Sequence, residues 1–172
     1  MKNINRLKNK GIALLASYFP ILAKRLIASY TPLESVDIPW MPVKKQLSES
    51  KIAMVTTAGL HHGYQKPFNM DDPAGDPSFR IINTKAIERD YVITHDYYDH
   101  RDADKDLNIV FPLTRLKEMA GAGIIGSVAK QHFSFMGHIT GLHLDELIEK
   151  NAPKVAAGFI QDHVDAVFLT PG

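Results

Sequence analysis

Cysteine is absent from the 172 residues of this chain, which excludes several kinds of chemistry within them. Without cysteine these residues form no disulfide, no thiolate zinc site and no catalytic thiol. A strong charge of one sign is also lacking, because 20 Lys plus Arg against 19 Asp plus Glu leave a formal charge of +1. That balance gives no electrostatic reason to expect nucleic acid as a partner.

Long hydrophobic runs are missing as well. Lys24 and Arg25 end the apolar stretch that begins at Gly11, well short of the roughly 20 residues that a membrane-spanning helix needs. No small-residue cleavage site of a secretory signal follows it, and we expect a cytoplasmic protein. The apolar residues of this region recur at helical spacing, which predicts an N-terminal amphipathic helix packed on the domain or on a partner. A basic helix of this kind is compatible with a membrane surface without requiring one, so we do not expect a membrane partner.

The rest of the chain divides into a connector and a domain. Pro32, Pro39 and Pro42 predict an extended connector that completes an N-terminal region over residues 1–47. Residues 48–172 alternate short apolar runs with helix-like segments, the pattern of an α/β domain. We expect a layered, largely parallel sheet with flanking helices.

Individual elements can be placed along this domain. The expected strands are Lys51–Thr57, Phe79–Ile82, Tyr91–Thr94 and a buried last strand, Val164–Leu169, with a further extended segment inside 124–135. The expected helices are Leu113–Ala120, Leu144–Lys150 and Pro153–Asp162, the last two separated at the proline.

The segment Thr94–Arg115 stands out because it gathers two histidines and five aspartates behind an apolar run. So many polar groups cannot be buried without partners, so they are solvated, paired with one another or bound to a ligand. His61 and His62 follow the first strand, at a position where open α/β sheets commonly form sites. A charged surface loop remains the alternative explanation of the segment.

Part of this cluster approaches a metal-binding pattern. His95, Asp99 and His100 come close to the His-x-His-x-Asp-His motif of the metallo-β-lactamases, but Tyr97 stands where the second histidine belongs. A phenol must lose a proton near pH 10 before it binds zinc well, so the ligand set is incomplete. We expect no metal here, and a hydrolase with a degenerate metal site stays an alternative.

Seven segments, in order along the chain, support a different interpretation. They are TTAG at 56–59, DPAGDPSFR at 72–80, HDYYD at 95–99, DLNIVFPLTRL at 106–116, GIIG at 123–126, HFSFMG at 132–137 and VDAVFLTPG at 164–172. The series resembles the selenoprotein B family, the B-type subunits of the glycine, sarcosine, betaine and D-proline reductases, and is most similar to the D-proline reductase type.

The resemblance implies reductive cleavage of a carbon–nitrogen bond next to a carboxylate. In this family a partner subunit with a pyruvoyl group binds the substrate amine, and a selenolate of the B-type subunit attacks the α-carbon. Thiol exchange then releases the product, so a thiol-reducing partner is implied too. A selenolate suits this role because it is ionised at neutral pH, as is a thiolate of low pKa.

The same resemblance bears on the residues after Thr170, Pro171 and Gly172. The related proteins carry selenocysteine or cysteine at the next position, which is absent here. We therefore expect a translation truncated at an in-frame UGA codon, an incomplete α/β domain and a chain that is inactive alone. If the frame truly ends, a non-catalytic binding or assembly subunit is the alternative.

Site residues follow from this interpretation. The candidates for proton transfer or catalysis are His95, Asp99 and His61. The candidates for substrate binding, or for presenting the nucleophile, are Tyr98, Asn108, Thr170 and Gly172. Each histidine has a structural alternative, since imidazole bridges backbone groups well. The identity of the small amino-acid substrate does not follow from the sequence.

Overall fold

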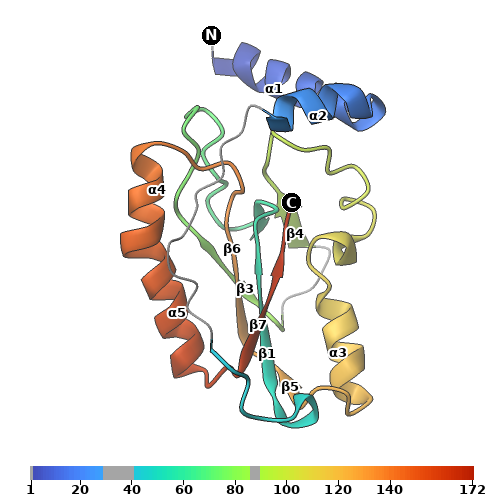
Figure 1. The fold of residues 1–172 in the computed structure, drawn as a ribbon, viewed down its shortest axis with the longest axis vertical. Helices are drawn as coiled ribbons and strands as arrows, with labels where there is room; N and C mark the ends of the chain where they lie inside the picture. Colours follow the sequence, from blue (N-terminus) through green and yellow to red (C-terminus); the bar gives the residue numbers. More distant parts are fainter. Residues whose placement is uncertain (1, 29–40, 86–89) are drawn as a thin grey trace.

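Parallel strands with helices on both faces make up the body of the protein in the computed structural model, which describes residues 2–28, 41–85 and 90–172 (Figure 1). The main sheet has the order β3-β6-β1-β5, with β7 on the other side of β1. The expected α/β class, with a mostly parallel sheet and an N-terminal helix, is confirmed. Most of the expected connector, residues 29–40, lies outside the described residues.

β1 (Lys51–Thr56) is the centre of this sheet. It pairs in parallel with β5 (Ser127–Val128) near its start, with β6 (Gln131–Ser134) near its end, and with β7 (Ala166–Thr170) along its length. β3 (Arg80–Asn83) runs antiparallel to β6. β1 is apolar on both sides because both of its faces are covered, as expected for a central parallel strand.

Two helical layers cover the sheet. On one face, α3 (Leu113–Gly121) contributes Leu113 and Leu116 to a core with Met54 of β1. On the other face, the core joins Val155 to Phe133 of β6. The second layer is one run made of α4 (Leu142–Glu146), the π-helical segment η4 (Leu147–Asn151) and α5 (Ala152–Gln161).

This helical run corrects the sequence-based expectation of a break before Pro153. The proline lies at the start of α5, directly after the π-helical segment. A proline lacks the N–H that an interior helical position donates, and the first turn of a helix leaves such donors unpaired in any case. The wider π turn therefore joins two helices that the proline was expected to separate.

A second correction concerns His61 and His62. They lie inside a short strand, β2 (Leu60–His62), which pairs antiparallel with β4 (Tyr91–Ile93) in a separate two-stranded sheet. The short extended run after Gly59 forms this strand instead of an open loop. Both histidines are consequently buried.

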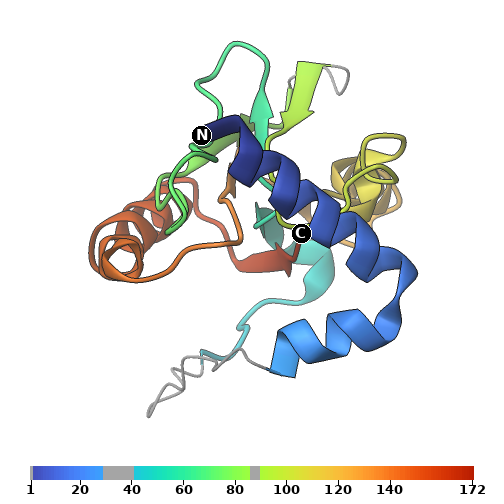
Figure 2. The ribbon, with the colours of Figure 1, turned by 90° about the horizontal axis from the view of Figure 1, so that it is seen from above.

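α1 (Lys2–Tyr18) and α2 (Pro20–Ala28) lie beyond the carboxyl ends of the strands, and α1 crosses above this end of the molecule (Figure 2). α1 is fixed there by Arg6, whose Nε donates to the buried Asp96 carboxylate at 2.6 Å. Lys10 lies 3.5 Å from the same carboxylate. Within the described residues, no helix has the length and apolar character needed to cross a membrane.

Candidate active site

The turn Thr57–Gly59, directly after β1, brings together several of the expected site residues. Gly172 lies against it, with its N–H donating to Thr57 Oγ1 at 3.1 Å. A Cβ added at Gly172 would come within 2.4 Å of Ala58 Cα, so only glycine allows this approach of the two backbones. The carboxyl ends of β1 and β7 therefore meet at Ala58, the type of location where parallel α/β sheets form sites.

Two hydroxyl groups connect the ends of β1 and β7 to one carbonyl oxygen, that of Val110. Thr170 Oγ1 donates to the Val110 carbonyl oxygen at 2.7 Å, and Thr56 Oγ1 donates to the same oxygen at 3.0 Å. Both threonines are buried. Thr170 is thus a positioning residue, because its side chain binds the neighbouring loop and its backbone leads to Gly172.

Tyr98 joins the segment after β4 to this turn. Its hydroxyl donates to the Ala58 carbonyl oxygen at 3.2 Å, and its ring meets His95 edge-on with 4.7 Å between centroids. Burial raises the pKa of Tyr98 above its usual range, so the hydroxyl stays protonated at neutral pH. Tyr98 and Gly172 therefore both contact the same residue, Ala58.

His95 is almost fully buried and is held between two backbone amides. The Tyr97 N–H points at Nδ1 from 3.1 Å, and the Gly137 N–H points at Nε2 from 3.3 Å. A neutral imidazole accepts at only one nitrogen, so one N–H at this ring lacks an acceptor in either tautomer. Burial lowers the pKa of His95 to about 4, which makes the ring neutral at pH 7.

Asp99 lies at the surface side of the same cluster. Its two oxygens accept from Arg101, at 2.9 Å from Nε and 2.7 Å from Nη2. These bonds lower the pKa of Asp99 to about 2. At neutral pH the carboxylate is therefore ionised, able to attract a positive group but unable to supply a proton.

The remaining expected site residues serve local structure. His61 bridges the His62 carbonyl oxygen at 2.8 Å and Thr94 Oγ1 at 2.9 Å. Asn108 donates from its backbone and its side-chain amide to Asp106 Oδ1, each at 3.0 Å, at the 3₁₀ turn Leu107–Ile109. Neither contact involves the turn at Ala58.

A cavity of about 280 Å³ lies between α1 and the cluster. Lys10 and Leu14 of α1 line one side, and His95, Tyr98 and Asp99 line the other together with His100 and Arg101. The sequence did not connect α1 to the site, because the link is the buried Asp96 and nothing in the run of aspartates marks which one is buried. The cavity brings Lys10 and Arg101 beside the Asp99 carboxylate, and these cations are already paired, Lys10 with Asp96 and Arg101 with Asp99.

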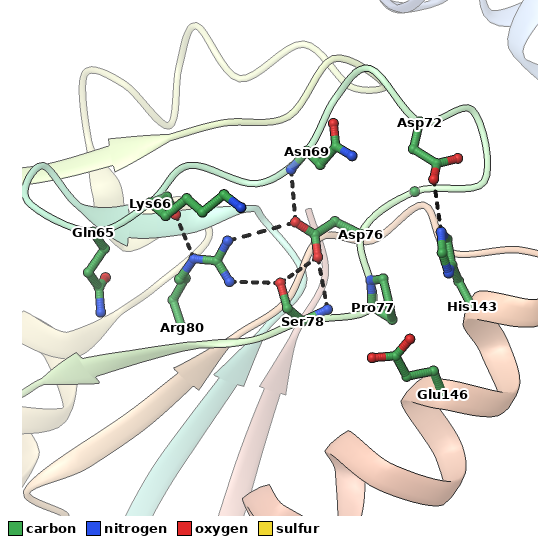
Figure 3. A pocket seen from close by; sticks show the side chains of 11 residues that line it. Gln65, Lys66, Asn69, Asp72, Asp76, Pro77, Ser78, Arg80, His143 and Glu146 are labelled. Carbon is green, nitrogen blue, oxygen red and sulfur yellow. Dashed lines mark hydrogen bonds and ion pairs between the residues drawn. The ribbon is translucent and has the colours of Figure 1, made fainter.

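A larger polar cavity of about 670 Å³ opens beside α4 (Figure 3). Its central charges are already paired. Arg80 donates to the Lys66 and Pro67 carbonyl oxygens and to Ser78 Oγ, and lies 3.7 Å from Asp76. His143 Nε2 lies 3.0 Å from Asp72 Oδ2, which lowers the pKa of Asp72. This network fixes the loop before β3 and lies apart from Gly172.

Among residues 2–28, 41–85 and 90–172, no group of three or more His, Cys, Asp or Glu side chains is placed to hold a metal ion. His132 accepts from the Met54 N–H at Nδ1 and contacts Thr84 Oγ1 at Nε2, both at 2.9 Å, so both of its ring nitrogens have partners.

Two of the buried imidazoles, those of His95 and His132, predict a pH-dependent stability. Burial lowers the pKa of His95 and of His132 to about 4, against about 6.5 in an unfolded chain. The free energy of unfolding is unaffected by the titration of these rings above pH 6.5. It decreases as the pH falls from 6.5 toward 4, because the two rings then bind protons in the unfolded state but not in the folded state. We expect roughly 2 kcal/mol less unfolding free energy per ring at pH 5 than at pH 7.5, measured by urea denaturation.

The variant His132→Asn provides the control, since its amide oxygen can still accept from Met54. It should lose the share of this pH dependence that His132 contributes, roughly 2 kcal/mol. Equal unfolding free energies at the two pH values would contradict the assignment of two neutral buried rings.

The chain is similar to a known family of reductase subunits. Residues 27–172 match the model of the family described as glycine/sarcosine/betaine reductase selenoprotein B. The chain is 36% identical to D-proline reductase subunit gamma of Acetoanaerobium sticklandii over 143 residues, covering 83% of this chain and 57% of that protein. No solved structure matches.

Two further relatives come from other reductases. The chain is 29% identical to glycine reductase complex component B subunit gamma of Carboxydothermus hydrogenoformans, covering 81% of this chain and 32% of that protein. It is 28% identical to sarcosine reductase complex component B subunit beta of Peptoclostridium acidaminophilum, covering 77% and 30%. The chain thus spans between about a third and just over half of the length of these relatives.

Proposed function

Because the chain belongs to the glycine/sarcosine/betaine reductase selenoprotein B family, we propose that it acts as the B-type subunit of an amino-acid reductase. The reaction is the reductive cleavage of the carbon–nitrogen bond next to a carboxylate. The substrate is a small amino acid or betaine of the D-proline, glycine or sarcosine type. The likeness to D-proline reductase subunit gamma, at 36% identity, favours D-proline among these.

The observation that carries the proposal is the position of Gly172. It rests on the Ala58 turn at the carboxyl ends of β1 and β7, and the Ala58 carbonyl oxygen accepts from the Tyr98 hydroxyl. We propose that a selenocysteine follows Gly172 in the full polypeptide and is the nucleophile. A selenolate is ionised at neutral pH and is also a good leaving group, which suits attack on carbon followed by thiol exchange.

Partner subunits complete this proposal. The relatives of this chain are named as subunits and components of reductases and reductase complexes. We propose a partner whose pyruvoyl group supplies electrophilic activation of the substrate amine, and a dithiol partner that regenerates the selenolate. A cytoplasmic location fits the need for reduced thiols.

The residues of this chain have distinct roles in the proposal. Thr170 and Tyr98 hold Gly172 and Ala58 in place. We propose that the Asp99–Arg101 pair and Lys10 bind the two charges of an amino acid in the cavity under α1 by exchanging ion-pair partners with it. His95 stays neutral and lines the same cavity beside Tyr98.

The test of this function is the coding DNA downstream of the Gly172 codon. We expect an in-frame UGA followed by an open frame that continues the similarity to the reductase subunits. Another stop codon, or a frame without that similarity, would contradict the proposed nucleophile. The chain would then be a binding or assembly subunit with the fold of the family.

A further inference from the structure

β7 is an edge strand with exposed apolar side chains, which corrects the sequence-based expectation of a buried last strand. Val167, Phe168 and Leu169 are 38%, 50% and 70% exposed. Within the described residues β7 pairs only with β1, so its outer edge has no partner strand. Strand edges with exposed apolar residues are liable to pair with other chains, and natural proteins normally cover them.

Both faces of β7 are open. Phe168 is opposite Met54 in the register with β1, on the face that α3 covers. Leu169 is opposite Val55, on the face that α5 covers. Figure 1 shows α3 and α5 on opposite sides of the sheet. The apolar cores of α3 and α5 do not include these side chains, so among residues 2–28, 41–85 and 90–172 the strand has no neighbour on its outer edge and no helix packed on Phe168 or Leu169.

An apolar groove of about 420 Å³ runs between β7 and α3. Its walls include Leu116 and Met119 of α3, and Ile52, Ala166 and Phe168 of the sheet. Nearly all of this lining is carbon, so a small polar ligand gains little there. An apolar side-chain row from a polypeptide helix would fill it.

We propose that β7 and this groove bind an α/β segment that adds a strand parallel to β7 and packs helices over Phe168 and Leu169. The segment is the part of the reductase B-type subunit that lies outside the present match, since only 57% of D-proline reductase subunit gamma is covered by this chain. This inference rests on the proposed function. It predicts that β7 becomes a central strand of a wider sheet, with the Gly172 turn in the middle of its edge.

A second copy of the chain would cover the exposed edge and faces of β7 less completely than an α/β segment. Two copies related by a twofold axis would bring their β7 strands together in antiparallel orientation. Each copy offers the same bare strand, so this pairing covers the edge without laying a new helix over Leu169. The α/β segment covers the edge and both faces.

The experiment is co-expression of the 172-residue chain with the unmatched part of D-proline reductase subunit gamma as a separately tagged polypeptide. The two should copurify, and hydrogen exchange of the amides at 166–170 should slow by about tenfold or more relative to the chain alone. Phe168→Glu and Leu169→Lys should each weaken the complex by about tenfold or more. Their thermal unfolding, measured on the chain alone, verifies that they fold.

The matched control is Val92→Glu, at an apolar residue of β4 that is 44% exposed. It should leave both the complex and the exchange at 166–170 unchanged. A dimer of the chain alone with slow exchange at 166–170 would replace the segment by a second copy. Absence of binding, or binding that both β7 variants retain, would overturn the inference. Copurification and hydrogen exchange require neither selenocysteine nor reductase activity. A negative result in them is therefore distinguishable from a failure of the proposed function.

Discussion

Gly59→Ala is expected to lower the free energy of unfolding by about 4 kcal/mol, more than most single substitutions do. Gly59 has a φ of +70°, and an added Cβ would lie 2.4 Å from the Thr94 carbonyl oxygen and 3.2 Å from His95 Cβ. The Gly59 N–H also donates to the Phe135 carbonyl oxygen, and its own carbonyl accepts from Thr94, each at 2.9 Å. These backbone groups cannot move aside without separating the main sheet from β2 and β4. Urea denaturation at pH 7.5 measures the loss.

Gly123→Ala is the matched control for this prediction. Gly123 has the same φ of +70°, but nothing lies within 4 Å of the position of its added Cβ. It isolates the cost of the left-handed backbone for an L-residue, about 1 kcal/mol. Equal losses for the two variants would show that the contact of Gly59 with Thr94 does not hold the site together.

Gly172→Ala is expected to reduce turnover by about a hundredfold in the reconstituted reductase, with little effect on unfolding. The added Cβ would lie 2.4 Å from Ala58 Cα and 2.9 Å from Ala58 N, so the backbone after Thr170 must move away from the turn. A nucleophile following Gly172 would move with it, and a displacement of about 1 Å from the reacting geometry costs roughly a hundredfold in rate. Product formation from D-proline with a dithiol reductant measures the effect.

The control is Gly121→Ala, at the end of α3, where an added Cβ meets nothing within 4 Å. It should leave turnover unchanged and make the chain slightly more stable, since alanine favours helix over glycine. Turnover of the Gly172 variant within about threefold of the parent would contradict the proposed position of the nucleophile, because a displaced nucleophile costs far more.

The sequence predicted the parts of the fold that depend on local pattern. The strand at Lys51–Thr56 and the helix at Leu113–Gly121 lie where apolar periodicity placed them. The convergence of Gly172 and Tyr98 on one residue, Ala58, was beyond the sequence, since it depends on the register of β7 with β1. The order of the seven sequence segments indicated the family, and the structure added the contacts at Ala58.

Three features could not be predicted because they depend on residues or segments that are distant in the sequence. Val167 to Leu169 have the apolar composition of a buried strand, yet their exposure depends on what lies beside β7. Asp96 is chemically like the other aspartates around it, and the approach of Arg6 and Lys10 from α1 compensates the burial of its charge. The same is true of His95, whose low pKa arises from its enclosure and from the neighbouring His100 and His138.

The most direct test of the central claim is an intact mass spectrum of the protein purified from its native source. A B-type reductase subunit with its nucleophile after Gly172 predicts a mass above that of the 172 residues, with the isotope pattern of one selenium atom. A mass equal to that of the 172 residues, without selenium, would contradict the claim that this chain presents the selenolate.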